Sequence, residues 1–226
     1  MPSFWSAALA IAAKDMKIEW RTKTAFASAI VFAVLVLAVF YFARDPTAVG
    51  ALDIAPGALW VTFTFAAMLG LNRAFMLESE NRAMDGLMLA PISPSAIFVG
   101  KFLGNLAFVG VVEAVSLPLF ILFYDLPIVG QLPALVSVIA MATVAFVAVG
   151  TLLSSMVVRT RFAELMLPIL LLPFLIPPIV GAVQLTSRIL SGRPLSDLAG
   201  WLKLLASFDI IFVILCFFLF EATLEE

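Results

Sequence analysis

The sequence predicts an all-α polytopic membrane protein with six transmembrane helices. Of its 226 residues, 64% are hydrophobic and only 12% are charged, and the mean hydropathy is +1.17. Soluble domains carry about 25% charged residues, so this composition is typical of a membrane protein. Apolar runs of about 20 residues, which is the length needed to cross the hydrocarbon core, recur along the chain. We therefore expect residues 1–226 to form a single transmembrane domain.

Residues 2–22 have the pattern of an amphipathic helix that lies in the membrane interface. An apolar stripe runs from Phe4 to Trp20 at four-residue spacing, and three basic residues lie on another face. The apolar run that follows, 24–43, carries no charge and is longer than the hydrophobic region of a signal peptide. We therefore expect this run to be retained as the first span.

The six predicted spans alternate with short polar connections. They lie at about 24–43, 54–75, 96–124, 133–158, 163–187 and 201–221. The third span contains Glu113 near its middle, which costs about 2.5 to 3.5 kcal/mol on insertion scales and is offset by the apolar residues around it. Glu113 is either a functional intramembrane acid or a structural residue that is protonated or paired with a polar neighbour.

The fifth span is unusually rich in proline. Proline removes a backbone hydrogen bond and kinks a helix, and the freed carbonyl must find another partner inside the hydrocarbon. We therefore expect this helix to be bent and buried against others, with structural kinks favoured over a moving gate. The kink positions are Pro168, Pro173, Pro177 and Pro178.

The longest polar interruption of the apolar pattern lies between the second and third spans. Residues 77–91 are predicted to form a short helix at the membrane surface, with its apolar residues along one edge and its charged residues in water. An ordinary solvated loop is the alternative. Ser93 followed by Pro94 is a favourable helix start, because serine can cap the first amides and proline is tolerated at the first helical position.

The basic residues predict the orientation in the membrane. With the N-terminus in the cytoplasm, the inner segments hold nine lysines and arginines and the outer segments hold four. This bias favours a cytoplasmic N-terminus and a cytoplasmic C-terminus. Segment 77–91 then faces the cytoplasm, where a soluble ATPase could reach it.

The residues that are missing restrict the chemistry. The chain has no histidine, its single cysteine, Cys216, lies in an apolar run, and no segment matches a phosphate-binding G-x-x-x-x-G-K-[ST] loop. We expect no catalytic residues, no metal site and no cofactor bound by this chain. Any ATP hydrolysis must come from another polypeptide.

Three segments carry a resemblance to a known family. Residues 80–94, followed by Gly100 and Lys101, resemble the cytoplasmic segment of ABC-2 type permeases. Together with 54–60 (Ile-Ala-Pro-Gly-Ala-Leu-Trp) and the proline-rich 167–177, they resemble the haem exporter protein B family (CcmB). This family supplies the membrane subunit of the ABC transporter for cytochrome c maturation in the bacterial cytoplasmic membrane. The resemblance covers nearly the whole chain.

The resemblance implies partners and a role for the polar segment. The expected partners are CcmA-like ATP-binding subunits, a second copy of this chain, CcmC-like and CcmD-like membrane subunits and a CcmE-like haem chaperone, with no nucleic acid. Haem would be handled or transported, although the missing histidine argues against strong axial ligation by this chain. The residues implied to couple to the ATPase are Glu78, Glu80, Arg82, Met84, Asp85, Gly86 and Leu87.

Two other functions remain open at this stage. The chain could be an ABC-2 exporter of a lipid, polysaccharide or drug, or a membrane scaffold that transports nothing. A neighbouring gene for an ATPase would separate the scaffold from the two transporters, and adjacent haem-handling genes would separate the two transporters from each other.

Overall fold

A computed structural model describes residues 3–45, 47–80, 86–87, 89–126, 130–157 and 163–225, with the side chains of 73–80, 163–164, 195 and 224–225 left aside. Within these ranges the chain forms long helices and no strand. The helices are α1 (Phe4–Thr22), α2 (Thr24–Ala43), α3 (Ala51–Glu80), α5 (Pro94–Tyr124), α6 (Leu132–Val157), α7 (Ala163–Leu190) and α8 (Leu195–Glu225). The predicted all-α class is confirmed.

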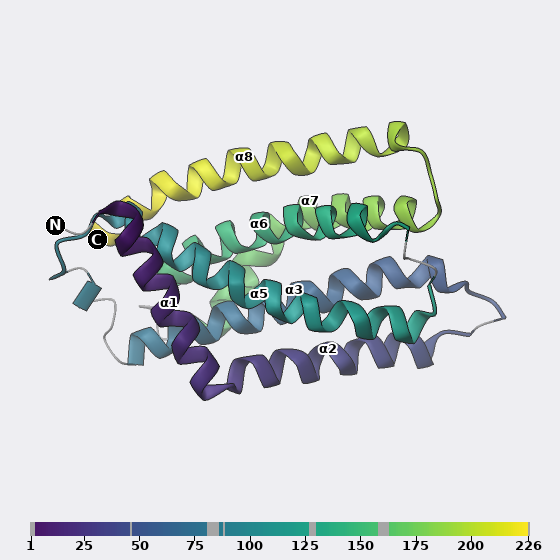
Figure 1. The fold of residues 1–226 in the computed structure, drawn as a ribbon, viewed down its shortest axis with the longest axis horizontal. Helices are drawn as coiled ribbons and strands as arrows, with labels where there is room; N and C mark the ends of the chain where they lie inside the picture. Colours follow the sequence, from purple (N-terminus) through teal and green to yellow (C-terminus); the bar gives the residue numbers. More distant parts are fainter. Residues whose placement is uncertain are drawn as a thin grey trace.

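Six of these helices, α2, α3, α5, α6, α7 and α8, are long and apolar enough to cross a membrane. They lie side by side along the long axis of the molecule, while the shorter α1 crosses the bundle at one end (Figure 1). Helix α2, Thr24–Ala43, has the same bounds as the run predicted for the first span. The chain is a multi-pass membrane protein, as predicted from its composition.

The two ends of the bundle differ. Helix α1 and both chain termini lie at one end, which we call the α1 end (Figure 1). The connections from α2 to α3, from α5 to α6 and from α7 to α8 lie at the opposite end, which we call the far end. Because the spans alternate in direction, α5 begins at the α1 end and finishes at the far end.

Local signals in the sequence set two of the helix starts. The Ser3 side chain accepts a hydrogen bond from the Ser6 amide at 3.3 Å and caps α1. The Ser93 side chain accepts a hydrogen bond from the Ala96 amide at 3.3 Å, and Pro94 occupies the first turn of α5. The predicted helix start at Pro94 is confirmed.

A single residue connects α1 to α2. Lys23 adopts a left-handed conformation, with φ of 56°. It follows the last residue of α1 and precedes the first residue of α2. The buried Glu19 carboxylate accepts a hydrogen bond from the Ala25 amide at 3.0 Å. This bond satisfies one of the free amides of α2 and places a negative charge at its positive end, so it fixes the angle between the two helices.

The core centres on α3, which is the most buried of the six candidate spans and packs against α2, α5, α6 and α7. The Trp60 ring of α3 is completely buried, and its Nε1–H donates a hydrogen bond to Thr186 Oγ1 of α7 at 2.9 Å. The ring also meets Phe63 and Phe146 edge-on. The Ile54–Trp60 motif and the proline-rich motif therefore lie on two helices that pack together.

The four prolines all lie inside α7, but not all of them are covered by the chain. Pro178 is buried and Pro168 is half-buried, whereas Pro173 and Pro177 are exposed on the surface of the bundle. The expected burial against other helices of this chain is therefore not found at these two positions. Leu171 and Leu175, which are buried, take the inward positions of α7, so Pro173 and Pro177 fall on its outer side.

Candidate functional site

The predicted coupling segment is only partly described. Helix α3 continues to Glu80, so Glu78 and Glu80 extend α3 instead of starting a new helix. Arg82, Met84 and Asp85 lie outside the described residues. Gly86 is helical and exposed, and Leu87 is helical, half-buried and packed against the main hydrophobic core. The roles of these residues in coupling stay a prediction.

Helix α1 and the start of α5 cross at close range. A Cβ atom added at Gly100 would lie 2.7 Å from the Ile11 Cβ and 2.8 Å from the carbonyl oxygen of Ala8. One turn later, a Cβ atom added at Gly104 would lie 3.5 Å from the Asp15 Cβ. The two glycines let the helix backbones approach each other, in the manner of small residues four positions apart in membrane helices.

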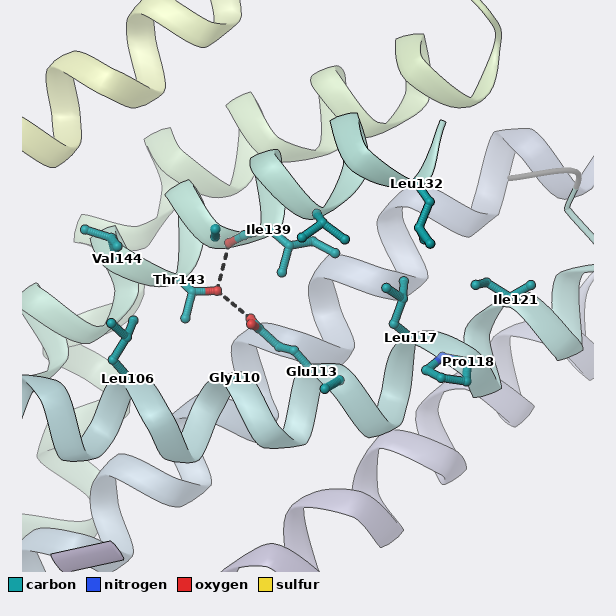
Figure 2. A pocket seen from close by; sticks show the side chains of 13 residues that line it. Leu106, Gly110, Glu113, Leu117, Pro118, Ile121, Leu132, Ile139, Thr143 and Val144 are labelled. Atoms are coloured by element: carbon teal, nitrogen blue, oxygen red, sulfur yellow. Dashed lines mark hydrogen bonds between the residues drawn. The ribbon is translucent and has the colours of Figure 1, made fainter. Parts of the chain in front are cut away.

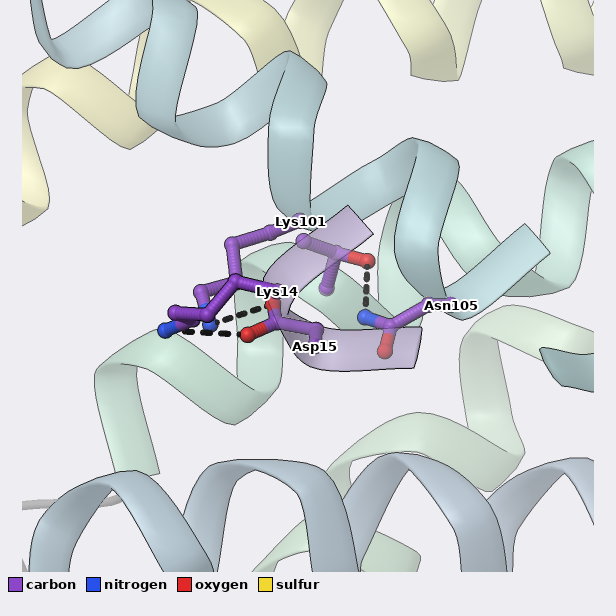
Figure 3. A network of polar contacts seen from close by, with 5 residues as sticks. Lys14, Asp15, Lys101 and Asn105 are labelled. Carbon is purple, nitrogen blue, oxygen red and sulfur yellow. Dashed lines mark hydrogen bonds and ion pairs between the residues drawn. The ribbon is translucent and has the colours of Figure 1, made fainter. Parts of the chain in front are cut away.

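An ion pair lies between these two glycines. The Lys101 Nζ of α5 is 2.7 Å from Asp15 Oδ2 of α1, and the Lys14 Nζ is 3.0 Å from Asp15 Oδ1 (Figure 3). Lys101 is 3% exposed. Burying an ammonium group without a partner costs several kcal/mol, so Asp15 compensates a cost that would otherwise oppose the docking of α1 on α5.

Asn105, one turn beyond Lys101, extends these polar contacts into the bundle. Its Nδ2 donates a hydrogen bond to Thr151 Oγ1 of α6 at 3.0 Å, and both residues are buried. Helix α5 is thus tied to α1 on one side and to α6 on the other. Asp15 and Asn105 were not predicted from the sequence, and the four-residue spacing of Gly100 and Gly104 is a signal only for the close helix contact.

Glu113 lies on α5 farther toward the middle of the bundle. It is 6% exposed, and its Oε1 is 2.7 Å from Thr143 Oγ1 of α6 (Figure 2). The same Thr143 hydroxyl lies 2.8 Å from the carbonyl oxygen of Ile139. Both residues line a groove of about 550 Å³ between α5 and α6. Glu113 is therefore paired with a polar neighbour, and whether its role is functional or structural stays a prediction.

Among the described residues, no three histidine, cysteine, aspartate or glutamate side chains lie close enough to hold a metal ion. Cys216, on α8, is buried. The polar side chains and glycines described above form ion pairs, hydrogen bonds and close contacts between helices. This arrangement is suited to fixing helices to one another.

Comparison with known protein families shows which family the chain belongs to. The family model described as "CcmB protein" matches residues 6–226. The chain belongs to the CcmB family. The match includes α1 from residue 6 onward, so the crossing of α1 and α5 lies within the part of the chain that the CcmB model covers.

Curated proteins named "Heme exporter protein B" match this chain over most of their length. "Heme exporter protein B" of Rhodobacter capsulatus is 29% identical over 195 residues, covering 84% of this chain and 89% of the relative. The protein of the same name from Pseudomonas aeruginosa is 28% identical over 198 residues, covering 86% and 87%. That of Paracoccus denitrificans is 28% identical over 179 residues, covering 79% and 82%.

Proposed function

We propose that this chain is the permease subunit of an ABC transporter that acts in cytochrome c maturation. It would couple ATP hydrolysis by a partner subunit to haem delivery, or to release of the haem-loaded chaperone at the outer face. Membership of the CcmB family and relatives named "Heme exporter protein B" support this proposal. The observation that carries the mechanism is the docking of α1 on the first turns of α5.

The mechanical path begins at segment 77–91. This segment connects α3 to α5, and α5 begins three residues after it, at Pro94. A force on the segment therefore acts first on the turns of α5 that hold Gly100, Lys101 and Gly104. Because these residues contact α1, and the Glu19 bond fixes α1 to the start of α2, all three elements would move as one body.

The orientation follows from the same proposal. The α1 end would face the cytoplasm, where the ATP-binding subunits are, and the far end would face outward, in the bacterial cytoplasmic membrane. The bias of nine basic residues against four supports this orientation.

A second copy of this chain would complete the permease. Apolar side chains exposed on α7 and α8 offer surfaces for it and for CcmC-like and CcmD-like subunits.

Haem would be the cargo of the complex, and the ligands of its iron would come from other subunits. The chain has no histidine and its only cysteine is buried, so it lacks the side chains that most often hold haem iron. Its own contribution would be to transmit movement across the membrane to the CcmE-like chaperone.

Deletion of the gene in its native host tests the proposal. Covalent c-type cytochromes should disappear, b-type cytochromes should remain, and haem should accumulate on its chaperone. Inactivating the partner ATPase should give the same result, because both lesions interrupt one mechanical path. Normal c-type cytochromes together with loss of an envelope lipid or polysaccharide would instead favour a general ABC-2 exporter.

A further inference from the structure

The groove between α5 and α6 is a second candidate site, away from the crossing of α1 and α5. It is lined by residues of these two helices alone, from Leu106 to Ile121 on α5 and from Leu132 to Val144 on α6 (Figure 2). Ala114 and Pro118 on one wall, and Val136 and Ala140 on the other, are exposed on the surface of the bundle. The groove therefore opens sideways to the hydrocarbon of the bilayer.

The groove is long enough for an extended chain. The fifteen helical steps from Leu106 to Ile121 on α5 span about 22 Å at 1.5 Å per residue. The groove has a volume of about 550 Å³. The volume lies in the range of small-molecule pockets, about 300 to 1,000 Å³.

One unpaired hydrogen-bond acceptor interrupts the apolar lining. It belongs to Glu113, whose single described hydrogen-bond partner is Thr143, so that Oε2 has none among the described residues. Glu113 and Thr143 both line the groove.

The hydrogen bonds of Thr143 indicate where the proton of Glu113 lies. The Thr143 hydroxyl has one proton but is within hydrogen-bond distance of two oxygens, the Ile139 carbonyl oxygen at 2.8 Å and Glu113 Oε1 at 2.7 Å. Both contacts are hydrogen bonds at once if Thr143 donates to Ile139 and a neutral Glu113 donates to Thr143. A neutral carboxyl also avoids the cost of an unpaired charge in this environment. Oε2 is then an acceptor without a donor.

Glu113 and Thr143 lie well inside α5 and α6, two of the candidate membrane spans. Glu113 is eleven residues from the end of α5 and Thr143 is eleven residues from the start of α6, which is about 16 Å from the far end in each case. The hydrocarbon core is about 30 Å thick. An acceptor left unpaired at that depth costs free energy, so a ligand that donates a hydrogen bond there is favoured over a plain hydrocarbon chain.

We propose that this groove binds a neutral, membrane-soluble amphiphile consisting of one apolar chain and a hydroxyl group. The hydroxyl donates to Glu113 Oε2, and the chain lies between α5 and α6 toward Ile121 and Leu132. A cationic donor is disfavoured because the carboxyl is neutral. A straight-chain alcohol and an isoprenoid alcohol both have this chemistry. The site is independent of the coupling function and of its partners.

Binding to the full-length protein in nanodiscs tests the proposal. The probes are radiolabelled hexadecanol and farnesol, each compared with its methyl ether, which keeps the chain and the oxygen but cannot donate. We expect each alcohol to bind about 10-fold more tightly than its ether, the size of a single hydrogen bond of about 1.4 kcal/mol. The alcohol with the larger ratio of alcohol affinity to ether affinity shows whether the groove prefers a straight chain or an isoprenoid chain. Equal binding of alcohol and ether would show that ordinary lipid chains fill the groove and would overturn the proposal.

Matched variants locate the site. Gly110→Leu places a side chain in the groove, and Gly57→Leu is its control on α3, since an added Cβ meets nothing within 4 Å at either position. Gly110→Leu should abolish alcohol binding and Gly57→Leu should leave it unchanged. Glu113→Leu should lower the affinity to that of the ether, whereas Glu113→Gln should preserve it because the amide can donate to Thr143 and still accept. Unchanged binding in Gly110→Leu would contradict the assignment.

A lipid-soluble carbodiimide, which reacts with protonated carboxyls, distinguishes a small ligand from a partner helix. In the intact complex, Glu113 should be labelled, and hexadecanol should protect it while the ether does not. Complete protection of Glu113 in the complex before any alcohol is added would mean that another subunit covers the groove. That result would overturn the proposal.

Discussion

Lys101 Nζ and Asp15 Oδ2 lie 2.7 Å apart although their residues are 86 positions apart in the sequence. The pair joins the start of α5 to the middle of α1, on the side of the bundle where segment 77–91 enters α5. This ion pair therefore connects the N-terminal helix α1 to the bundle of candidate membrane spans.

Replacing Gly100 should loosen α1. Gly100→Leu would place a side chain against the backbone of Ala8 and the Cβ of Ile11, and neither can move without displacing α1. Gly104→Ala is the control, because its new Cβ would sit at 3.5 Å from the Asp15 Cβ, an ordinary contact. We expect faster proteolysis of α1 in membranes containing Gly100→Leu and normal resistance in Gly104→Ala. Equal resistance would contradict the close crossing.

A disulfide between positions 15 and 104 should form readily. An added Cβ at Gly104 lies 3.5 Å from the Asp15 Cβ, within the range for disulfide-bonded cysteines. Oxidising the variant Asp15→Cys, Gly104→Cys should therefore link α1 to α5, as detected by peptide mapping. The native Cys216 is buried on α8, and a variant with only one introduced cysteine controls for it. Absence of the link under mild oxidation would count against this geometry.

The bond between Trp60 and Thr186 should hold α3 and α7 together. Trp60→Phe or Thr186→Val leaves one buried polar partner unsatisfied, at a cost of about 1 to 3 kcal/mol. The double variant should lose less than the sum of the two single variants, because neither polar group is then left unpaired. Thermal unfolding of purified protein in detergent measures this coupling. Strict additivity would indicate that the hydrogen bond contributes little.

The orientation can be tested with reporter fusions. Asp125 and Arg193 lie in the connections at the far end, between α5 and α6 and between α7 and α8. Alkaline phosphatase fused after either residue should be active, since this enzyme matures only outside the cytoplasm. An inactive phosphatase with an active cytoplasmic reporter at the same position would reverse the proposed topology.

Features encoded locally could be predicted from the sequence. The span at 24–43 and the helix start at Ser93 and Pro94 depend on apolar length and capping, which are properties of neighbouring residues. The spacing of Gly100 and Gly104 in α5 indicates a close helix contact but not which helix makes it. The partners of Lys101 and Glu113 depend on which helices pack together, so they could not be predicted. The outward position of Pro173 could not be predicted either. Helix α7 carries apolar residues on all of its faces, so its sequence does not indicate which face packs against the other helices.

In the proposed mechanism, α5 carries movement from the coupling segment to α1 during cytochrome c maturation. Charge reversal at the Lys101–Asp15 pair tests this step, with covalently bound haem and the ATPase activity of the complex measured in the same cells. Lys101→Asp and Asp15→Lys each remove the pair at a cost of about 3 kcal/mol, which shifts the docking of α1 about 150-fold. Lys14→Met, at a more exposed position, is the control.

We predict that each single reversal lowers c-type cytochromes at least about 5-fold while ATP hydrolysis continues, that the combined reversal restores most of them, and that Lys14→Met has little effect. Normal c-type cytochromes in both single variants, or no recovery in the double variant, would contradict this mechanism.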